Sequence, residues 1–235
     1  AENVAKAHGI TREMQDELAL ASQRKAAAAQ DAGKFKDEIV DVVMPQKKGD
    51  PLVFNADEYI NKKTTADALA GLRPAFDKAG SVTAGNASGV NDGACALLLA
   101  SEDAVKAHDL KPKARIIAAA TAGLPPRIMG FGPAPAIQKV LAMTGLTLNQ
   151  MDVIELNEAF AAQALAVTRA LGLRDDDPRV NPNGGAIALG HPLGASGARL
   201  TATAMYQLQR TRGKYALCSM CIGVGQGIAL IIERV

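Results

Sequence analysis

The chain has 235 residues, of which 48% are hydrophobic and 21% charged, and its formal net charge is +2. This length accommodates one large domain or two small ones, with enough apolar residues to bury a core. Acids and bases are interspersed, which argues against a dedicated nucleic-acid binder. We expect no membrane partner, because no apolar run reaches spanning length and no signal peptide is evident. The three cysteines indicate no disulfide framework, so we expect a reducing, cytoplasmic setting.

Capping residues and apolar spacing predict the elements in chain order. A helix begins at the N-cap Thr11 and ends at Gly33, a strand follows at 39–43, and the polar stretch 45–65 forms surface loops. Further strands are expected at 94–100, 115–122, 153–156, 215–221 and 227–233, and further helices after Ser101 and at 133–145, 158–171 and 194–209.

Alternating strands and helices predict a layered α/β fold with a mixed, mostly parallel sheet. The final two strands are joined by a short turn and should therefore pair antiparallel. The chain begins inside a predicted helix and without Met, so we expect a fragment whose fold is incomplete at the N-terminus.

Three loops carry residues suited to chemistry. The segment 183–197 places five glycines around His191, Asn157 follows the strand at 153–156, and Cys221 ends the strand at 215–221. Loops beyond strand ends converge in open α/β sheets. An amide, an imidazole, a thiol and glycine N–H groups together suit acyl transfer, in which an oxyanion must be held and a proton moved.

Each of these residues also has a structural interpretation. Asn157 fits a helix N-cap, Cys221 fits a small buried hydrophobe, and a lone histidine is commonly a satisfied polar residue. A single Cys-x-x-Cys at 218–221 does not predict a zinc site, and no G-x-G-x-x-G opens a helix after a strand. The lysines of 45–65 are either solvated or form a basic surface for a phosphorylated ligand.

Four motifs in this order resemble the thiolase family: 83–89 (TAGNASG), 157–160 (NEAF), 184–197 around His191, and 221–223 (CIG). The resemblance implies the layered αβαβα thiolase fold and an acyltransferase. Such an enzyme cleaves 3-ketoacyl-CoA thiolytically to acetyl-CoA and a shortened acyl-CoA, or runs the reverse Claisen condensation, through a cysteine acyl-enzyme. It needs no cofactor or metal, because coenzyme A is a substrate. A homodimer or homotetramer is expected, with acetoacetyl-CoA or β-ketoadipyl-CoA as the related substrates.

The resemblance also implies roles for single residues. Cys221 is the acid/base that moves the α-proton, and His191 is the base that activates the nucleophilic cysteine and helps to hold an acyl oxygen. Asn157 fixes a water in that oxyanion site, and the Gly223 N–H serves a second oxyanion hole. Six residues match positions that line the tunnel for coenzyme A and its pantetheine arm: Phe76, Ala84, Ser88, Met129, Ala159 and Phe160.

Departures from the family pattern predict limits. We expect residues 1–85 to be part of a coenzyme A-binding loop domain, 86–112 a strand–helix unit of an absent N-terminal half-domain, and 113–235 the C-terminal half-domain. The family's nucleophile lies in that half-domain, so this chain alone is expected to be inactive. The competing hypothesis is a non-catalytic module that binds acyl-CoA or a partner. Val224 replaces a common glycine and is expected to narrow the loop beside the thiol.

Overall fold

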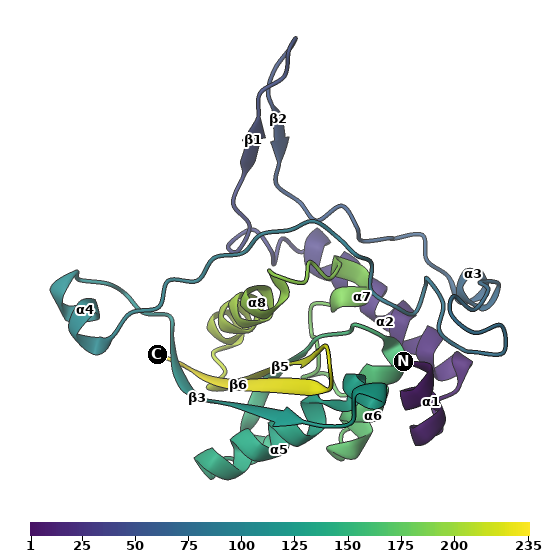
Figure 1. Ribbon diagram of the computed structural model, residues 1–235. Coiled ribbons are helices and arrows are strands. Elements are labelled where there is room, and N and C mark those ends of the chain that lie inside the picture. The colour runs from purple at the N-terminus through teal and green to yellow at the C-terminus, as the bar shows by residue number, and fades with distance from the viewer.

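A computed structural model describes all 235 residues, and its centre is a four-stranded sheet in the order β3-β6-β5-β4 (Figure 1). The strands span Ala114–Gly123 (β3), Met151–Leu156 (β4), Tyr215–Ile222 (β5) and Gln226–Arg234 (β6). The sheet is mixed, as expected, but parallel pairing does not dominate it. Only β4 and β5 run parallel, whereas β6 pairs antiparallel with both β5 and β3.

Helices cover both faces of the sheet. Pro133–Thr144 (α5) packs against β3 and β6, and Ser196–Thr211 (α8) packs against β4 and β5 on the other face. Strand alternation divides the core accordingly. Ile154 and Leu217 join the cluster beneath α5, whereas their neighbours Val153 and Cys218 join the cluster beneath α8. The result is three layers, α–β–α, within the expected layered class.

The N-terminal helices lie against the C-terminal half of the chain. Glu2–His8 (α1) contacts Ala161–Ala170 (α6), and Arg12–Asp31 (α2) lies across both α6 and the short helix Ala186–Leu189 (α7). Thr11 caps α2 as predicted, because its hydroxyl accepts a hydrogen bond from the Met14 N–H. The remaining short elements are Ala66–Ala70 (α3), Glu102–Ala107 (α4), Pro126–Phe131 (η1) and Leu148–Gln150 (η2).

The predicted buried strand at 94–100 is wrong. These residues belong to no strand or helix, and most of them are exposed, including Leu98 at 83%. The segment 94–100 is thus as apolar as a buried strand, but it does not pair with another strand in this structure. The helix expected after Ser101 does form, as α4, and its N-terminal Ala104 N–H bonds to the Ser101 hydroxyl.

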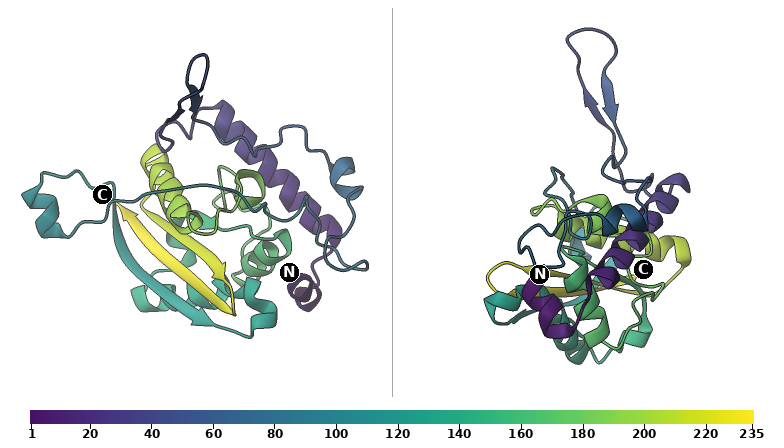
Figure 2. Two further views of the ribbon diagram at one scale, coloured as in Figure 1. Left: turned by 45° about the horizontal axis from the view of Figure 1, so that its top comes forward. Right: turned by 90° about the vertical axis from the view of Figure 1, so that its right-hand side faces the viewer.

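A two-stranded hairpin projects away from the rest of the molecule (Figure 2). Val42–Met44 (β1) pairs antiparallel with Leu52–Phe54 (β2), within regions predicted as a strand and as loops. All six residues are apolar and all six are exposed. No helix of the structure combines the length and the apolar character that crossing a bilayer requires.

Candidate active site

His191 is held between two side chains. Its Nδ1 lies 2.6 Å from Ser196 Oγ, and its Nε2 lies 3.2 Å from Asn157 Nδ2. Ser196 already donates its hydroxyl proton to the Pro192 carbonyl, so it can only accept from His191. The proton of the neutral ring therefore sits on Nδ1, which leaves a lone pair on Nε2 facing the Asn157 amide.

The electrostatics of this site favour the neutral ring. Burial lowers the pKa of His191, and the positive charge of Arg199 lowers it further. A neutral imidazole with an exposed lone pair is a base. Once Nε2 has accepted a proton, the same atom becomes a donor that can hold a developing oxyanion.

Asn157 is fully buried and does not cap a helix, since α6 begins only at Ala161 with Phe160 as its N-cap. Its backbone N–H instead bonds to the Ser219 carbonyl, 2.9 Å away, on the neighbouring strand β5. The side-chain oxygen of Asn157 has no hydrogen-bond partner in the protein. A buried amide oxygen of this kind is suited to accept from a water or a ligand group.

Cys221 lies near the carboxyl end of β5, next to the carboxyl end of β4. Because β4 and β5 are parallel and Leu156 pairs with Ser219, Cys221 lies at the end of β5 beside the strand end that carries Asn157. Cys221 is 6% exposed, and burial raises the pKa of its thiol. It therefore stays protonated near neutral pH and is suited to donate a proton. Cys218 is buried under α8, and Cys95 is half-buried near the His191 loop.

Four of the six predicted tunnel residues lie together. The N–H and hydroxyl of Ser88 both donate to the Ala159 carbonyl, at 3.1 and 3.2 Å. The ring of Phe160 meets that of Phe76 edge to face, and both line a hollow of about 250 Å³. Phe76 is 72% exposed, so a ligand that covered it would bury apolar surface. Ala84 lies on an exposed turn and Met129 in η1, and their roles stay predictions.

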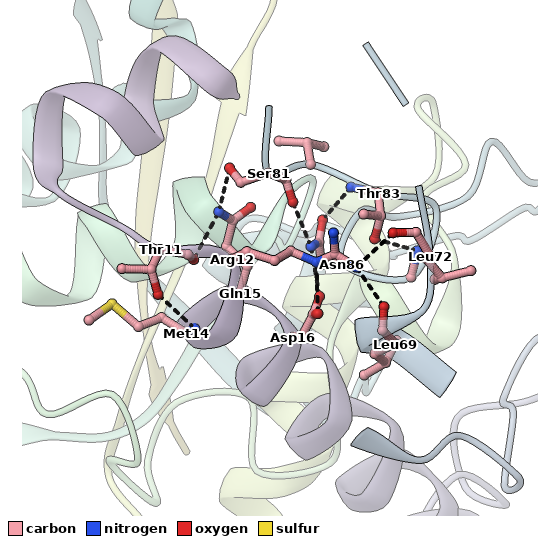
Figure 3. A network of polar contacts seen from close by, with 12 residues as sticks. Thr11, Arg12, Met14, Gln15, Asp16, Leu69, Leu72, Ser81, Thr83 and Asn86 are labelled. Carbon is pink, nitrogen blue, oxygen red and sulfur yellow. Dashed lines mark hydrogen bonds and ion pairs between the residues drawn. The ribbon is translucent and has the colours of Figure 1, made fainter. Parts of the chain in front are cut away.

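The loop that carries Ser88 is anchored by a polar network (Figure 3). Asn86 is fully buried, and its side chain accepts from the Thr83 N–H and donates to Asp16 on α2. Arg12 binds Asp16 in turn and donates to the Leu69 carbonyl near α3. The Asn86 carbonyl accepts the first N–H of α6, from Ala161. One residue thus joins the Ser88 loop to the segment that carries Asn157.

The turn after Cys221 differs from expectation. Gly223 is exposed on this turn, and its role as an oxyanion donor stays a prediction. Val224 is 82% exposed, so it does not narrow the loop beside the thiol. Lys62 forms an ion pair with Asp31, and Lys63 is exposed next to it.

Some positioning residues were not foreseen. Ser196 fixes the tautomer of the His191 ring. The side-chain oxygen of Asn91 accepts a hydrogen bond from the backbone N–H of His191 at 3.2 Å. Ser196 lies within the motif 184–197 and Asn91 two residues after the motif 83–89, but sequence periodicity does not tell which hydroxyl or amide faces the His191 ring or backbone.

Glu155 yields a prediction about stability. It is fully buried, with one contact of 3.3 Å to Arg199. Burial raises the pKa of Glu155 to about 8, and the pull of Arg199 only partly offsets this. Between about pH 4.5 and 8 the unfolded carboxyl ionises while the folded one keeps its proton, so stability falls as pH rises through this window.

Glu155→Gln should therefore flatten the pH dependence of unfolding. We expect the free energy of unfolding to fall less between pH 5 and 9 in the variant, by up to about 4 kcal/mol. Urea denaturation across this range measures the difference. Glu102→Gln, on the exposed surface of α4, is the control and should follow the wild type. Parallel curves for Glu155→Gln and wild type would contradict the prediction.

The fold and this site define a layered α/β protein whose strand-end loops carry an imidazole, an amide and a thiol. The pattern of "Thiolase, N-terminal domain" matches residues 1–103, and that of "Thiolase, C-terminal domain" matches 110–234. The chain belongs to the thiolase family.

Named relatives and solved structures agree with this assignment. The chain is 66% identical over its full length to a beta-ketoadipyl-CoA thiolase of Acinetobacter baylyi and 60% identical to the 3-oxoadipyl-CoA/3-oxo-5,6-dehydrosuberyl-CoA thiolase of Escherichia coli. It covers 59% of each relative. The acetyl-CoA acetyltransferase of Bacillus anthracis superposes over the whole chain and 59% of its own, with a TM-score of 0.95 at 46% identity. Human mitochondrial 3-ketoacyl-CoA thiolase in complex with CoA superposes over 57% of its chain, with a TM-score of 0.90 at 48% identity.

These matches correct three expectations. Residues 1–103 match the N-terminal domain of the family, so that domain is not absent. The expectations that the chain lacks its nucleophile and is an inactive fragment are not supported. A non-catalytic binding module is not supported either, since the relatives are named as enzymes. The three predicted domain bounds stay predictions.

Proposed function

We propose that the protein containing this chain is an acyltransferase that cleaves a 3-ketoacyl-CoA with coenzyme A, or runs the reverse condensation. One observation carries the proposal: the lone pair of His191 Nε2 faces the Asn157 amide, and Cys221 ends the adjoining strand. A base in contact with a buried amide, and a protonated thiol on the adjoining strand, are therefore found at the carboxyl ends of β4 and β5. No cofactor or metal enters the proposed reaction.

The chemistry divides between the three residues. His191 Nε2 takes the proton of the nucleophilic cysteine thiol, and the sulfur of that cysteine forms a new S–C bond at the 3-keto carbon of the substrate. Nε2–H and a water held by Asn157 then bind the resulting oxyanion. Collapse of this intermediate breaks the bond between C2 and C3 and releases an acetyl-CoA enolate. Cys221 donates its proton to C2 of the enolate and completes acetyl-CoA. The shortened acyl group, held as a thioester on the attacking cysteine, then passes to the thiol of coenzyme A. The Cys221 thiolate takes up the proton of that thiol, and His191 Nε2–H returns its proton to the departing cysteine.

We propose 3-oxoadipyl-CoA, the β-ketoadipyl thioester, as a substrate, because relatives 56 to 66% identical carry that name. The test measures thiolysis of this compound and of acetoacetyl-CoA by the wild-type protein at equal enzyme concentration. We expect acetyl-CoA and an acyl-CoA shortened by two carbons, with the higher kcat/KM for 3-oxoadipyl-CoA. Preference for acetoacetyl-CoA would contradict the substrate, and no thiolysis of either would contradict the function. The proposed setting is cytoplasmic, consistent with three free thiols.

A homo-oligomer is the proposed assembly. The exposed apolar hairpin β1–β2 supports it, because six contiguous apolar side chains on a projecting ribbon mark a contact surface. We expect Val43→Asp to shift the protein to a smaller species in sedimentation velocity, with an unchanged far-UV spectrum. Lys47→Ala, at the hairpin tip, should leave the mass unchanged. An unaltered mass for Val43→Asp would rule out the hairpin as the contact.

A further inference from the structure

The buried carboxylate of Glu158 is the meeting point of three segments. It lies next to Asn157 in sequence and is 4% exposed. Ser22 Oγ on α2 donates to its Oε2 at 2.6 Å, and Asn181 Nδ2 donates to its Oε1 at 2.8 Å. The Ile187 N–H of α7 donates to Oε2 at 3.3 Å. Three neutral donors thus converge on one carboxylate, which forms no salt bridge.

Gly184 and Gly185, which precede His191, allow the backbone of the His191 loop to lie directly against α2 and the Glu158 carboxylate. A Cβ on Gly185 would lie 2.2 to 2.5 Å from the carboxyl atoms of Glu158. A Cβ on Gly184 would lie 2.6 Å from that of Ala26, and Gly184 has φ +83°. Only glycine lets the loop approach this closely. These two glycines therefore seat the His191 loop on Glu158 and α2.

The same contacts bracket Asn157 from both sides. Asn181 accepts from the Leu156 N–H and donates to the Leu156 carbonyl, at 2.9 and 2.8 Å. It thereby fixes the residue before Asn157 while it binds the residue after it. On the other branch, Ile187 belongs to α7, which leads directly into His191. Ser22 also accepts the Gly185 N–H at 3.0 Å, so α2 holds the start of α7 as well.

We propose that Glu158 is a positioning residue that sets the contact between the Asn157 amide and His191 Nε2. The inference rests on the proposed function for its effect on turnover. Glu158 itself touches neither reacting atom. Its carboxylate ties the backbone on each side of the contact to α2, and this holds the amide and the ring 3.2 Å apart. Mutations at Glu158 or Ser22 should therefore act through His191.

The direction of the effect follows from the hydrogen bond. The Asn157 side-chain Nδ2–H donates to the lone pair of neutral His191 and thereby stabilises the neutral ring. Loss of this contact raises the pKa of His191. In the 3-ketoacyl-CoA thiolysis assay, the acid limb of the kcat/KM profile should move to higher pH. The oxyanion site becomes misaligned in the same step, so kcat should fall while KM changes little.

The test compares Glu158→Gln and Ser22→Ala with wild type. We expect kcat to fall about 100-fold and about tenfold respectively, with KM within twofold. The titration of His191, followed by NMR in histidine-labelled protein, should shift upward by about half a pH unit in both. Glu17→Gln, an exposed substitution on α2, should change neither quantity.

The NMR titration keeps the inference separate from the proposed function. If the wild type shows no thiolysis, the proposed function fails, whereas the His191 shift still tests the positioning role. A folded Glu158→Gln variant with an unchanged His191 titration would overturn the inference, whether or not its activity fell. If Glu158→Gln does not fold, Ser22→Ala decides by the same readouts, because it removes one donor and leaves the carboxylate in place.

Discussion

Replacing Cys221 by alanine is expected to lower kcat for thiolysis by about 10²- to 10⁴-fold, the usual contribution of a positioned acid or base. The reason is the fate of the acetyl-CoA enolate. Its C2 must receive a proton, and the thiol of buried Cys221 is a protonated group at the strand end. Alanine fills most of the same space, so we expect the fold to survive.

Cys218→Ala is the matched control for this prediction. Cys218 lies on the same strand, three residues earlier, and is buried to a similar degree. It packs under α8, and strand alternation points its side chain to the opposite face of the sheet from Cys221, so its loss should leave kcat within about twofold. Stopped-flow measurement of thioester loss gives both rates. A turnover for Cys221→Ala within threefold of wild type would remove this thiol from the mechanism.

Removing the imidazole of His191 should have a comparable effect. His191→Ala loses the base that activates the attacking thiol and the donor that binds the oxyanion, and each role contributes at least about 10²-fold. We expect kcat/KM to fall by about 10³-fold or more. Because burial lowers the pKa of His191, the acid limb of the wild-type kcat/KM profile should lie below pH 6.5.

That acid limb separates a catalytic histidine from a structural one. In His191→Ala the residual activity should no longer show it, because the titrating group is gone. His108→Ala, at the exposed end of α4, should retain both the rate and the pH profile. A residual activity that keeps the acid limb would assign this limb to another group and would contradict the proposed base.

The residues of the candidate site could be selected from their types, because Asn157, His191 and Cys221 end or follow predicted strands or lie in a glycine-rich loop, and their catalytic roles stay predictions. Their arrangement was not. The glycines of the His191 loop were interpreted as N–H groups suited to acyl transfer, yet Gly184 and Gly185 lie against α2 and Glu158. Sequence reports that a backbone must come close to something, but only the fold identifies what it meets.

The fold shows the same limit. Local signals predicted the helix caps at Thr11 and Ser101 and the antiparallel β5–β6 pair, because each depends on neighbours in sequence. The segment 94–100 was predicted as a buried strand from its apolar run, yet burial depends on a partner strand that no local pattern encodes. The dominance of antiparallel pairing arises likewise, because β3 joins the sheet beside β6 rather than beside β4.

We propose that His191 and Cys221 serve one reaction at one site. A double-mutant cycle on kcat/KM for thiolysis tests it most directly, with His191→Ala, Cys221→Ala and the double variant. Residues that act as a unit are strongly non-additive. We predict that the double variant is no more than about tenfold slower than the slower single variant. If the fold-losses of kcat/KM in the two single variants multiply in the double variant, or if either single variant is as active as wild type, the claim is contradicted.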